Sequence, residues 1–483
     1  MNQVTAQQFE TVIGLEVHLQ LNTKTKIFCG CVNEFGKAPN TLTCPVCLGL
    51  PGSLPVINKQ AVDNAIKIGL AFNCTINPFI KFDRKNYYYP DLPKGYQISQ
   101  YDLPLASNGC VFIPLPDGRT KKINIKRAHL EEDAGKLIHD NSPNSSLVDY
   151  NRTGAPLIEI VTEPDLRNAQ EAYDYLQTLK LTLQYLNVSD CDMEKGSLRC
   201  DANISIMEKG ATEFGKKAEI KNLNSFKAVK AALEFEERRH QQMYLNGVQI
   251  IQETRLWNDE TQQTLPMRSK EEAHDYRYFP EPDLAPLIIE KEAIEQIRQS
   301  LPELPAEKLG RLIKEYKISE YDARILIQDQ DIASFFEECA KLYPETKKIC
   351  NWMIGPYLQE LNERKMTPGQ MALKPEHLIS IIKKVDAGIL SNLTAKDTFK
   401  FVVESGKSPD EVIQEKGLAQ VSDDGTLEKI VDEVMADNPQ IVEQIKQGKD
   451  KAAAFLIGQA MKKSQGKGNP KKFGDLIKRR FSL

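Results

Sequence analysis

No run of apolar residues in the 483-residue chain approaches the roughly 20 residues that a membrane-spanning helix needs. The first residues, Met1 to Gln8, also lack the basic and apolar regions of a secretory signal peptide. The net charge is only -4, so the chain as a whole has no excess of positive charge that would indicate nucleic-acid binding. Together these absences predict a cytoplasmic protein.

The usual phosphate-binding and nucleophile motifs are missing as well. Neither the P-loop pattern GxxxxGK[ST] nor the dinucleotide-binding pattern GxGxxG occurs, and there is no GxSxG nucleophile elbow. If a nucleotide binds, basic side chains have to neutralise its phosphates. Seven such side chains are candidates, although each could equally be an ordinary surface charge: Arg84, Lys85, Arg127, Lys136, Arg152, Arg199 and Lys221.

Ten cysteines in a chain of this length do not indicate a disulfide scaffold. Four of them form two doublets, Cys29-Gly-Cys31 and Cys44-Pro-Val-Cys47, which are roughly a dozen residues apart as in zinc knuckles. Four thiolates would complete a tetrahedral site and leave no open position, so a structural zinc site is favoured over a redox or catalytic one. We expect the other six to be buried as small apolar residues: Cys74, Cys110, Cys191, Cys200, Cys339 and Cys350.

The pattern of the chain changes from strand to helix along its length. Strand and turn patterns dominate the first ~290 residues, and helical periodicity follows. The segment Ser300 to Pro305 is the predicted junction, and helices are predicted over Ala306 to Tyr316 and Asp331 to Leu342. A second break falls near Asn362 to Gly369. The chain is therefore predicted to be an α+β protein with domains at 1–292, 293–365 and 366–483.

Three predicted strands alternate between an apolar and a polar face. In Thr11 to Leu21 the odd positions are apolar, which places Glu16 and His18 together on the opposite face. The strands Leu198 to Ile206 and Lys217 to Lys221 behave in the same way. Their polar faces hold Arg199, Asp201, Asn203 and Ser205 in the first strand, and Lys217, Glu219 and Lys221 in the second.

The segment from Ile125 to Asp165 contains acidic residues in a stretch that is predicted to form buried strands, where carboxylates are unusual. Three consecutive acids at 131–133 precede a β-branched run in which Glu159 and Glu163 are evenly spaced, so both are predicted to point to one face. A carboxylate inside an apolar strand is costly to bury unless a cation meets it. Arginine partners or a metal ion would serve, and the other strands favour the metal.

Each of these strands alone is typical of a half-solvated antiparallel sheet, and for a single strand that interpretation is the better one. Asp and Asn are depleted in strands, however, so the whole set favours a cation site. A site rich in oxygen atoms with one imidazole suits Mg²⁺ or Mn²⁺ better than zinc, and Mg²⁺ in such sites usually carries nucleotide phosphates. The proposed ligands are Glu16, His18, Glu132, Glu159 and Asp201.

Nine motifs spread over the first 283 residues resemble the GatB family of tRNA-dependent Asp/Glu amidotransferases. The archaeal GatE proteins are similar but carry a large inserted domain, for which this chain has no room. Several of the motifs are eight residues long and of uncommon composition. They occupy positions 12–18, 51–56, 81–87, 94–100, 129–136, 152–159, 196–203, 221–226 and 275–283.

The resemblance implies a cradle-shaped antiparallel domain, a helical domain and a YqeY-like helical tail. It also implies a reaction in which Glu or Asp, mischarged on tRNA(Gln) or tRNA(Asn), is phosphorylated by ATP at its side-chain carboxylate and then amidated by ammonia. The implied partners are an amidase subunit, GatA, which supplies the ammonia, and a small subunit, GatC, in a heterotrimer. The missing nucleophile agrees with this division of labour.

The resemblance also assigns roles to particular residues. It places the five candidate ligands above at the divalent-metal positions of the family. It implies a structural zinc for the cysteine quartet. Neighbouring residues in the same motifs are assigned to substrate binding: Glu131, Asp133, Lys136, Arg152 and Asn203.

The carboxyl-terminal segment is strongly basic. From Lys446 to Leu483 nine Lys and two Arg stand against two Asp, a net charge of +9. Such a segment is commonly just a solvated face, but here the lysines follow an amphipathic helical pattern from Ala453 to Met461. Lysines without interleaved aromatics suit phosphate-backbone contact. With the resemblance, they are predicted to bind tRNA: Lys462, Lys463, Lys471 and Lys472, with Lys467 beside them.

Two other functions fit parts of the sequence. A non-catalytic tRNA-binding scaffold would keep the basic tail and the zinc site, but it has no use for the carboxylate set. A self-sufficient metal-dependent hydrolase would use the same acids, but it leaves the basic tail unexplained.

Overall fold

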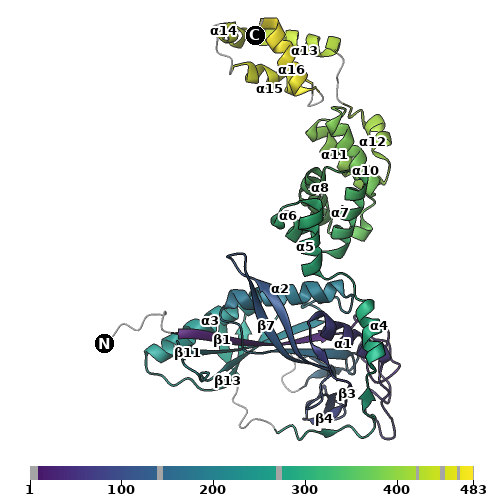
Figure 1. Ribbon diagram of the computed structural model, residues 1–483, viewed down its shortest axis with the longest axis vertical. Helices are drawn as coiled ribbons and strands as arrows, with labels where there is room; N and C mark the ends of the chain where they lie inside the picture. The colour runs from purple at the N-terminus through teal and green to yellow at the C-terminus, as the bar shows by residue number, and fades with distance from the viewer. Residues whose placement is uncertain are drawn as a thin grey trace. The chain divides into compact units, whose positions relative to one another are not determined.

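The computed structural model describes residues 9–138, 145–267, 275–419, 424–446, 452–464 and 468–481 (Figure 1). The chain divides into two compact units, Met1–Leu304 and Pro305–Leu483. The first unit is built on β-sheet and the second on helices, which confirms the predicted α+β class. The break lies at 304/305, within the segment from Ser300 to Pro305, while the domain bounds at 292/293 and 365/366 stay predictions. The expectations for Met1 to Gln8 and for Lys467 lie outside the described residues.

The first unit contains a nine-stranded sheet with the order β14-β13-β12-β11-β1-β10-β7-β6-β2. Strand β1 (Phe9–Gln20) lies in its interior, antiparallel to β10 (Pro156–Thr162) on one side and to β11 (Leu198–Glu208) on the other. Strands β12 and β13 pair in parallel. The remaining strands of the sheet are β2 (Thr75–Ile76), β6 (Ala106–Pro114), β7 (Thr120–Glu132), β12 (Ala218–Leu223), β13 (Glu253–Asn258) and β14 (Gln263–Pro266).

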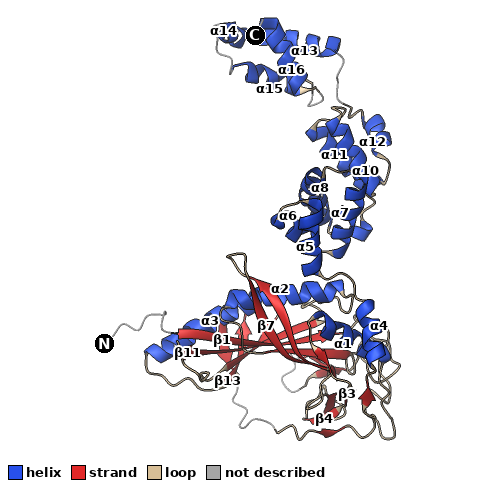
Figure 2. Ribbon diagram, in the orientation of Figure 1, coloured by secondary structure: helices blue, strands red, loops and turns tan. Residues whose placement is uncertain are grey.

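One face of this sheet is apolar and is covered by helices. The odd residues of β1 from Ile13 to Leu19 are at most 1% exposed, which confirms the predicted alternation. They share a core with α1 (Lys59–Ala71), α2 (Ala169–Tyr185) and α3 (Phe226–Leu245). Figure 2 shows α2 and α3 along one side of the sheet. The opposite face is therefore left to the polar side chains.

Smaller elements lie beside the large sheet. Figure 2 shows β3 and β4 on the side of the sheet away from α2. They belong to a two-stranded sheet, β16-β3, and a three-stranded sheet, β15-β4-β5, while β8 pairs with β9. Their bounds, with the last helix of the unit, are β3 (Phe79–Ile80), β4 (Asp83–Asn86), β5 (Tyr96–Ser99), β8 (Lys136–Ile138), β9 (Leu147–Asp149), β15 (Phe279–Pro280), β16 (Leu287–Ile288) and α4 (Lys291–Gln299).

The second unit is helical throughout its described residues. The predicted helices at 306–316 and 331–342 are confirmed as α5 and α7. Near the carboxyl end, Leu456 and Phe473 lie at the centre of an apolar cluster of their own. None of the described helices of the chain is long and apolar enough to cross a membrane. The bounds are α5 (Pro305–Tyr316), α6 (Glu320–Leu326), α7 (Gln330–Leu342), α8 (Thr346–Trp352), a π-helical turn (Met353–Tyr357), α9 (Leu358–Arg364), a 3₁₀ turn (Pro368–Gln370), α10 (Pro375–Asp386), α11 (Asn392–Ser405), α12 (Pro409–Lys416), α13 (Asp424–Asp437), α14 (Pro439–Lys446), α15 (Ala453–Lys463) and α16 (Pro470–Phe481).

Two detailed predictions are wrong. Glu163 does not continue the alternation from Glu159, because β10 ends at Thr162 and its register against β7 shifts between Val161 and Thr162. Cys110 is half-buried rather than buried, whereas the other five scattered cysteines are buried as predicted.

Candidate active site and metal centre

Four neighbouring strands place one row of titratable side chains across the polar face of the sheet. Glu159 of β10 is opposite His18 of β1 on one side and opposite His129 of β7 on the other. His18 in turn is opposite Arg199 of β11. Because side chains of directly paired residues project from the same face, this row lies away from the helices. Glu131 joins it from β7, two residues beyond His129.

The row converges into a compact cluster. The Nε2 atom of His18 lies 3.4 Å from Glu159 Oε2 and 3.9 Å from Glu131 Oε1. The Nε2 atom of His129 lies 3.4 Å and 3.6 Å from the same two carboxylates. Ligand atoms of His18, Glu131 and Glu159 all lie within 4.8 Å of one another, which is close enough for one metal ion. Two carboxylates and an imidazole form the donor set that Mg²⁺ or Mn²⁺ accepts.

The protonation of this cluster follows from burial and mutual attraction. Burial raises the pKa of Glu131 and of Glu159, but hydrogen bonds and charges from His129 and His18 more than offset it, so both pKa values are lowered. Burial lowers the pKa of His18, and the hydrogen bond and charge of Glu159 reverse that effect, so its pKa is raised. The carboxylates are therefore held ionised, as ligands of a cation must be.

A second acidic group adjoins this cluster. Glu16 of β1 is opposite Asp201 of β11, and Glu16 accepts a 3.0 Å hydrogen bond from Asn203. Lys221 of β12 donates to Asp201 at 2.6 Å and lies 2.8 Å from Glu219. Burial and the charge of Glu159 are the main causes that raise the pKa of Glu16. Asp201 is thus already paired with a lysine, whereas Glu16 is surrounded by other carboxylates that disfavour its ionised form.

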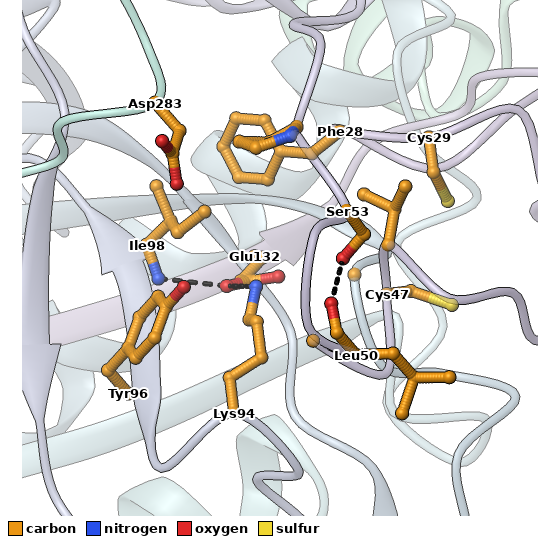
Figure 3. A pocket seen from close by; sticks show the side chains of 14 residues that line it. Phe28, Cys29, Cys47, Leu50, Ser53, Lys94, Tyr96, Ile98, Glu132 and Asp283 are labelled. Carbon is orange, nitrogen blue, oxygen red and sulfur yellow. Dashed lines mark hydrogen bonds and ion pairs between the residues drawn. The ribbon is translucent and has the colours of Figure 1, made fainter.

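Glu132 faces away from this cluster, since it is adjacent to Glu131 in the strand. Its carboxylate pairs with Lys94 and accepts a 2.9 Å hydrogen bond from the backbone of Ile98. It lines a pocket that also contains Phe28, Cys47 and Ser53 (Figure 3). Figure 3 shows Lys94 and Ile98 meeting the Glu132 carboxylate, with Cys29 and Cys47 on the side of the pocket away from Ile98. The structure therefore brings Glu131, and not Glu132, beside His18 and Glu159.

The predicted substrate residues are mostly engaged with the protein itself. Asp133 accepts hydrogen bonds from Arg199 at 2.9 Å and Gln20 at 2.7 Å, and it lies 3.5 Å from Arg152. Arg152 also donates to the carbonyls of residues 134 and 135 at 2.9 and 2.6 Å. Lys136 is exposed on β8. These contacts indicate that Asp133 and Arg152 hold the surrounding protein groups in place rather than binding substrate directly.

Of the seven basic candidates, three interact electrostatically with the acids of the polar face: Lys85, Arg199 and Lys221. Burial lowers the pKa of Lys85, and the charges of Glu131 and Glu159 more than offset it, so its pKa is raised. Arg199 has its pKa raised chiefly by the charge of Asp133. Arg84, in contrast, is held 2.7 Å from Glu281. The site therefore has both acids for a cation and fixed positive charges for an anion.

The four clustered cysteines converge as predicted from their spacing. One sulfur each from Cys29, Cys31, Cys44 and Cys47 lies within 4.8 Å of the others. All ten thiols of the chain are free. Lys26, with no exposed surface, places its ammonium 3.6 Å from the Cys47 sulfur and donates to the Leu42 carbonyl at 2.7 Å. A buried cation beside the thiols fits a cluster that carries negative charge, as metal-bound thiolates do.

The tail lysines lie on two helices of the second unit. Lys462 is exposed at the end of α15, while Lys463 lies 2.9 and 3.0 Å from Glu433 and Asp437 of α13. Lys471 is exposed and Lys472 is half-buried in the first turn of α16. Lys463 is therefore paired with acids, and tRNA binding by the four lysines stays a prediction.

Reasoning from the sequence missed His129 at the cluster and did not place Glu131 there. The signal was available in the parity of β7. Ala128 and Leu130 are buried apolar residues, so the residues between and after them, His129 and Glu131, belong to the opposite face.

Comparison with known proteins agrees with this arrangement. Residues 11–295 match the family described as "GatB/GatE catalytic domain", and residues 334–481 match the one described as "GatB domain". A protein of Thermoanaerobacter sp. (strain X514), named as the B subunit of aspartyl/glutamyl-tRNA(Asn/Gln) amidotransferase, is 53% identical over 98% of this chain and 100% of its own length. Proteins of the same name from Carboxydothermus hydrogenoformans and Persephonella marina are also 53% identical, over 98% and 96% of this chain and 98% of their own lengths.

The fold and the acidic site thus define a catalytic domain of the GatB/GatE type. With its second matching domain and its full-length relatives, the chain belongs to the GatB family.

Proposed function

We propose that this chain is the component of a tRNA-dependent amidotransferase that activates the side-chain carboxylate of Glu-tRNA(Gln), Asp-tRNA(Asn) or both. In the overall reaction, ATP phosphorylates that carboxylate and ammonia displaces the phosphate, so that Gln-tRNA or Asn-tRNA is formed. The observation that supports this most is the convergence of His18, Glu131 and Glu159 beside Lys85 and Arg199. The family membership agrees with it.

A divalent cation is the first requirement of such a site. We assign His18, Glu131 and Glu159 to a Mg²⁺ ion, with Glu16 and Asp201 beside them. When bound, Mg²⁺ supplies positive charge to the phosphate oxygens of ATP. His129 lies against Glu131 and Glu159 at 3.6 and 3.4 Å and so fixes both carboxylates in orientation. Glu132 is assigned to the neighbouring pocket instead, because Lys94 already neutralises it.

Positively charged side chains are needed beside the cation to neutralise the phosphates of ATP. Lys85 and Arg199 lie in the field of Glu131, and we propose that they neutralise the phosphates in place of a P-loop. Asp133 holds Arg199 at 2.9 Å and so positions its guanidinium. Lys221, paired with Asp201 at 2.6 Å, keeps that carboxylate oriented.

The other parts of the chain supply structure and substrate binding. We propose that the cysteine quartet holds a structural zinc, supported by the four convergent sulfurs and the buried Lys26. We propose that Lys462, Lys463, Lys471 and Lys472 contact the tRNA backbone. The proposed partners are the amidase subunit GatA and the small subunit GatC. The ten free thiols fit the reducing cytoplasm.

Two adjacent glutamates allow a matched test. In the complex reassembled with its amidase and small subunits, Glu131→Gln is expected to lower tRNA-dependent ATP consumption by at least about 100-fold, because it removes a cation ligand. The Mg²⁺ concentration for half-maximal ATP consumption should rise in Glu131→Gln and stay unchanged in Glu132→Gln. Glutaminase activity of the partner is the control for assembly.

The scaffold alternative predicts something different. If the chain only presented tRNA to a partner, Glu131→Gln and wild type would consume ATP equally. That result would refute the proposed function. The buried acids of the cluster favour the catalytic proposal, since a scaffold gains nothing from burying Glu131 at 2% exposure beside another carboxylate.

A further inference from the structure

Four tyrosine rings form a ladder beside the proposed active site, and two of them, Tyr276 at 38% and Tyr101 at 53%, are exposed at the surface of the first unit. The Tyr87 and Tyr276 rings meet edge to face with centroids 6.1 Å apart, and Tyr276 meets Tyr278 in the same way at 6.2 Å. Tyr278 then stacks on Tyr101 at 4.3 Å, with an angle of only 15° between the two planes. The last ring is 53% exposed, so the ladder ends in solvent.

The ladder is tied to the active site through two cations. Lys85, which lies in the field of Glu131 and Glu159, places its ammonium 4.9 Å from the centre of the Tyr276 ring. Arg127 of β7 donates a 3.0 Å hydrogen bond to the carbonyl of Tyr101. Arg127 precedes His129 by two residues on the same strand, about 7 Å along it. The stacked pair therefore lies beside the cluster.

An aromatic ring that is both exposed and held in a stack offers a preformed face to a flat ligand. Tyr101 presents more than half of its surface to water although its ring is pre-stacked on Tyr278 and its backbone is anchored by Arg127. Aromatic platforms flanked by cations are the usual device for single-stranded nucleic acid, because bases stack on the rings and phosphates meet the charges. The charges here are Lys85 and Arg127.

We propose that Tyr101, backed by Tyr278, is the platform on which the unpaired terminal adenine of the acylated tRNA stacks. This inference rests on the proposed function. The amino acid is esterified to the ribose of that terminal nucleotide, so its carboxylate reaches His18 and Glu159 only if the nucleotide is held close by. Stacking would supply that positioning without hydrogen bonds to the base edges, and Arg127, which is already bonded to the Tyr101 carbonyl, would meet the adjoining phosphate.

The test uses steady-state ATP consumption by the reassembled complex with Glu-tRNA(Gln). Tyr101→Ala is expected to raise the KM for Glu-tRNA by about 5- to 150-fold, the usual contribution of one stacked base, with little change in kcat. Tyr101→Phe keeps the ring face and should behave as wild type. The control is Tyr321→Ala, which removes a tyrosine that is 71% exposed on α6. Retained glutaminase activity shows that each variant assembles.

A double-mutant cycle identifies the base. The second substrate is the same tRNA, chemically acylated, with an abasic terminal ribose. In wild type, loss of the base should raise KM as Tyr101→Ala does, and in Tyr101→Ala it should cost nothing further. Independent, multiplying penalties would overturn the inference, as would a rise in the KM for ATP instead, which would assign the platform to the nucleotide. Failure of the wild-type complex to consume ATP with Glu-tRNA would refute the proposed function instead.

Discussion

Lys26 is the most unusual single residue of the structure. It has no exposed surface, and its ammonium contacts a carbonyl and a thiol sulfur rather than a carboxylate. Burying an ammonium without an anion costs several kcal/mol, so the residue makes sense beside thiolates that carry negative charge. Hydrogen bonding from Cys29 and the charge of Lys26 are among the causes that lower the pKa of Cys47 to about 4. The lysine is therefore the counter-charge of the proposed zinc site.

This role predicts the behaviour of Lys26→Met. The apolar side chain has a similar length, but the thiolate cluster loses its compensating charge. Zinc should then bind about 10- to 100-fold more weakly, as when other outer partners of metal ligands are removed. Competition of the purified protein with a coloured chelator measures this. Unchanged zinc affinity would show that Lys26 acts through the Leu42 carbonyl alone.

At the same scale, the sequence predicts which face of a strand a residue lies on better than it predicts which residues of other strands it contacts. It assigned Glu16, His18, Glu159 and Asp201 to one face because alternation along a strand is local. It grouped Glu132 with them as one of three consecutive acids at 131–133, although the parity of β7 places Glu131, and not Glu132, on the polar face. His129 and Glu131 meet Glu159 through the pairing of β7 with β10, which is a long-range property.

At the level of elements, a buried ionic network joins α3 to β13, and Arg255 of β13 donates a 2.9 Å hydrogen bond to the carbonyl of Thr264 on β14. Glu236, fully buried on α3, pairs with Arg239 at 2.7 Å and with Arg255 of β13 at 3.2 Å. Glu253 pairs with both arginines, at 2.8 and 3.0 Å. His240 is fully buried among these charges, 3.5 Å from Glu236. The network fastens the edge strands of the sheet to the helix that covers them.

His240 gives this network a defined pH dependence. Burial is the main cause that lowers its pKa from 6.5 to about 4, partly opposed by Glu236. Below pH 6.5 the unfolded histidine takes up a proton and the folded one does not, so the unfolding free energy falls as the pH falls towards 4. His240→Gln should remove about 2 kcal/mol of that fall between about pH 6.5 and about pH 5, where the carboxylates stay ionised.

The chain offers a local probe for this measurement. Of its two tryptophans, Trp257 is buried on β13 and Trp352 lies on α8. Urea unfolding followed by fluorescence in a Trp352→Phe background therefore reports on the network. Equal pH dependence with and without His240 would contradict the prediction.

The elements themselves were predictable to different degrees. Helices α5 and α7 follow a strong 3.6-residue pattern, and the sequence predicts them to within one residue of their bounds. The end of β10 was not predictable, because its last residues are β-branched like the rest. The strand ends at Thr162, where its register against β7 shifts, and that register is not visible in the sequence.

At the scale of the whole molecule, charge is divided unevenly along the chain. The basic tail carries a net +9 while the chain carries -4 in total. The fold class was readable from the switch between strand and helical patterns. The sequence could not show which tail lysines are free to contact tRNA. Lys463 forms ion pairs with Glu433 and Asp437, which join α15 to α13 and depend on the folded structure.

These contacts sharpen the prediction for tRNA binding. Charge reversal at the exposed pair, Lys462→Glu with Lys471→Glu, should weaken binding and make the salt dependence shallower by about one unit of slope for each lost phosphate contact. Lys463→Glu should weaken binding less. The measurement is tRNA affinity at several salt concentrations. Lys314→Glu with Lys341→Glu, on α5 and α7, is the control with the same charge change. Equal effects of both pairs would mean that only net charge matters.

The interior position of β1 has a consequence for how the protein is made. Glu16 is hydrogen-bonded to Asn203, 187 residues further along the chain, and the backbone of Leu15 to Thr162, 147 residues away. At synthesis rates of about 5–20 residues per second, the ribosome needs roughly 10–40 s to make the strand that β1 awaits. During that interval the nascent strand exposes an apolar face and at least one unpaired edge, so this chain should depend on chaperones while it is being translated.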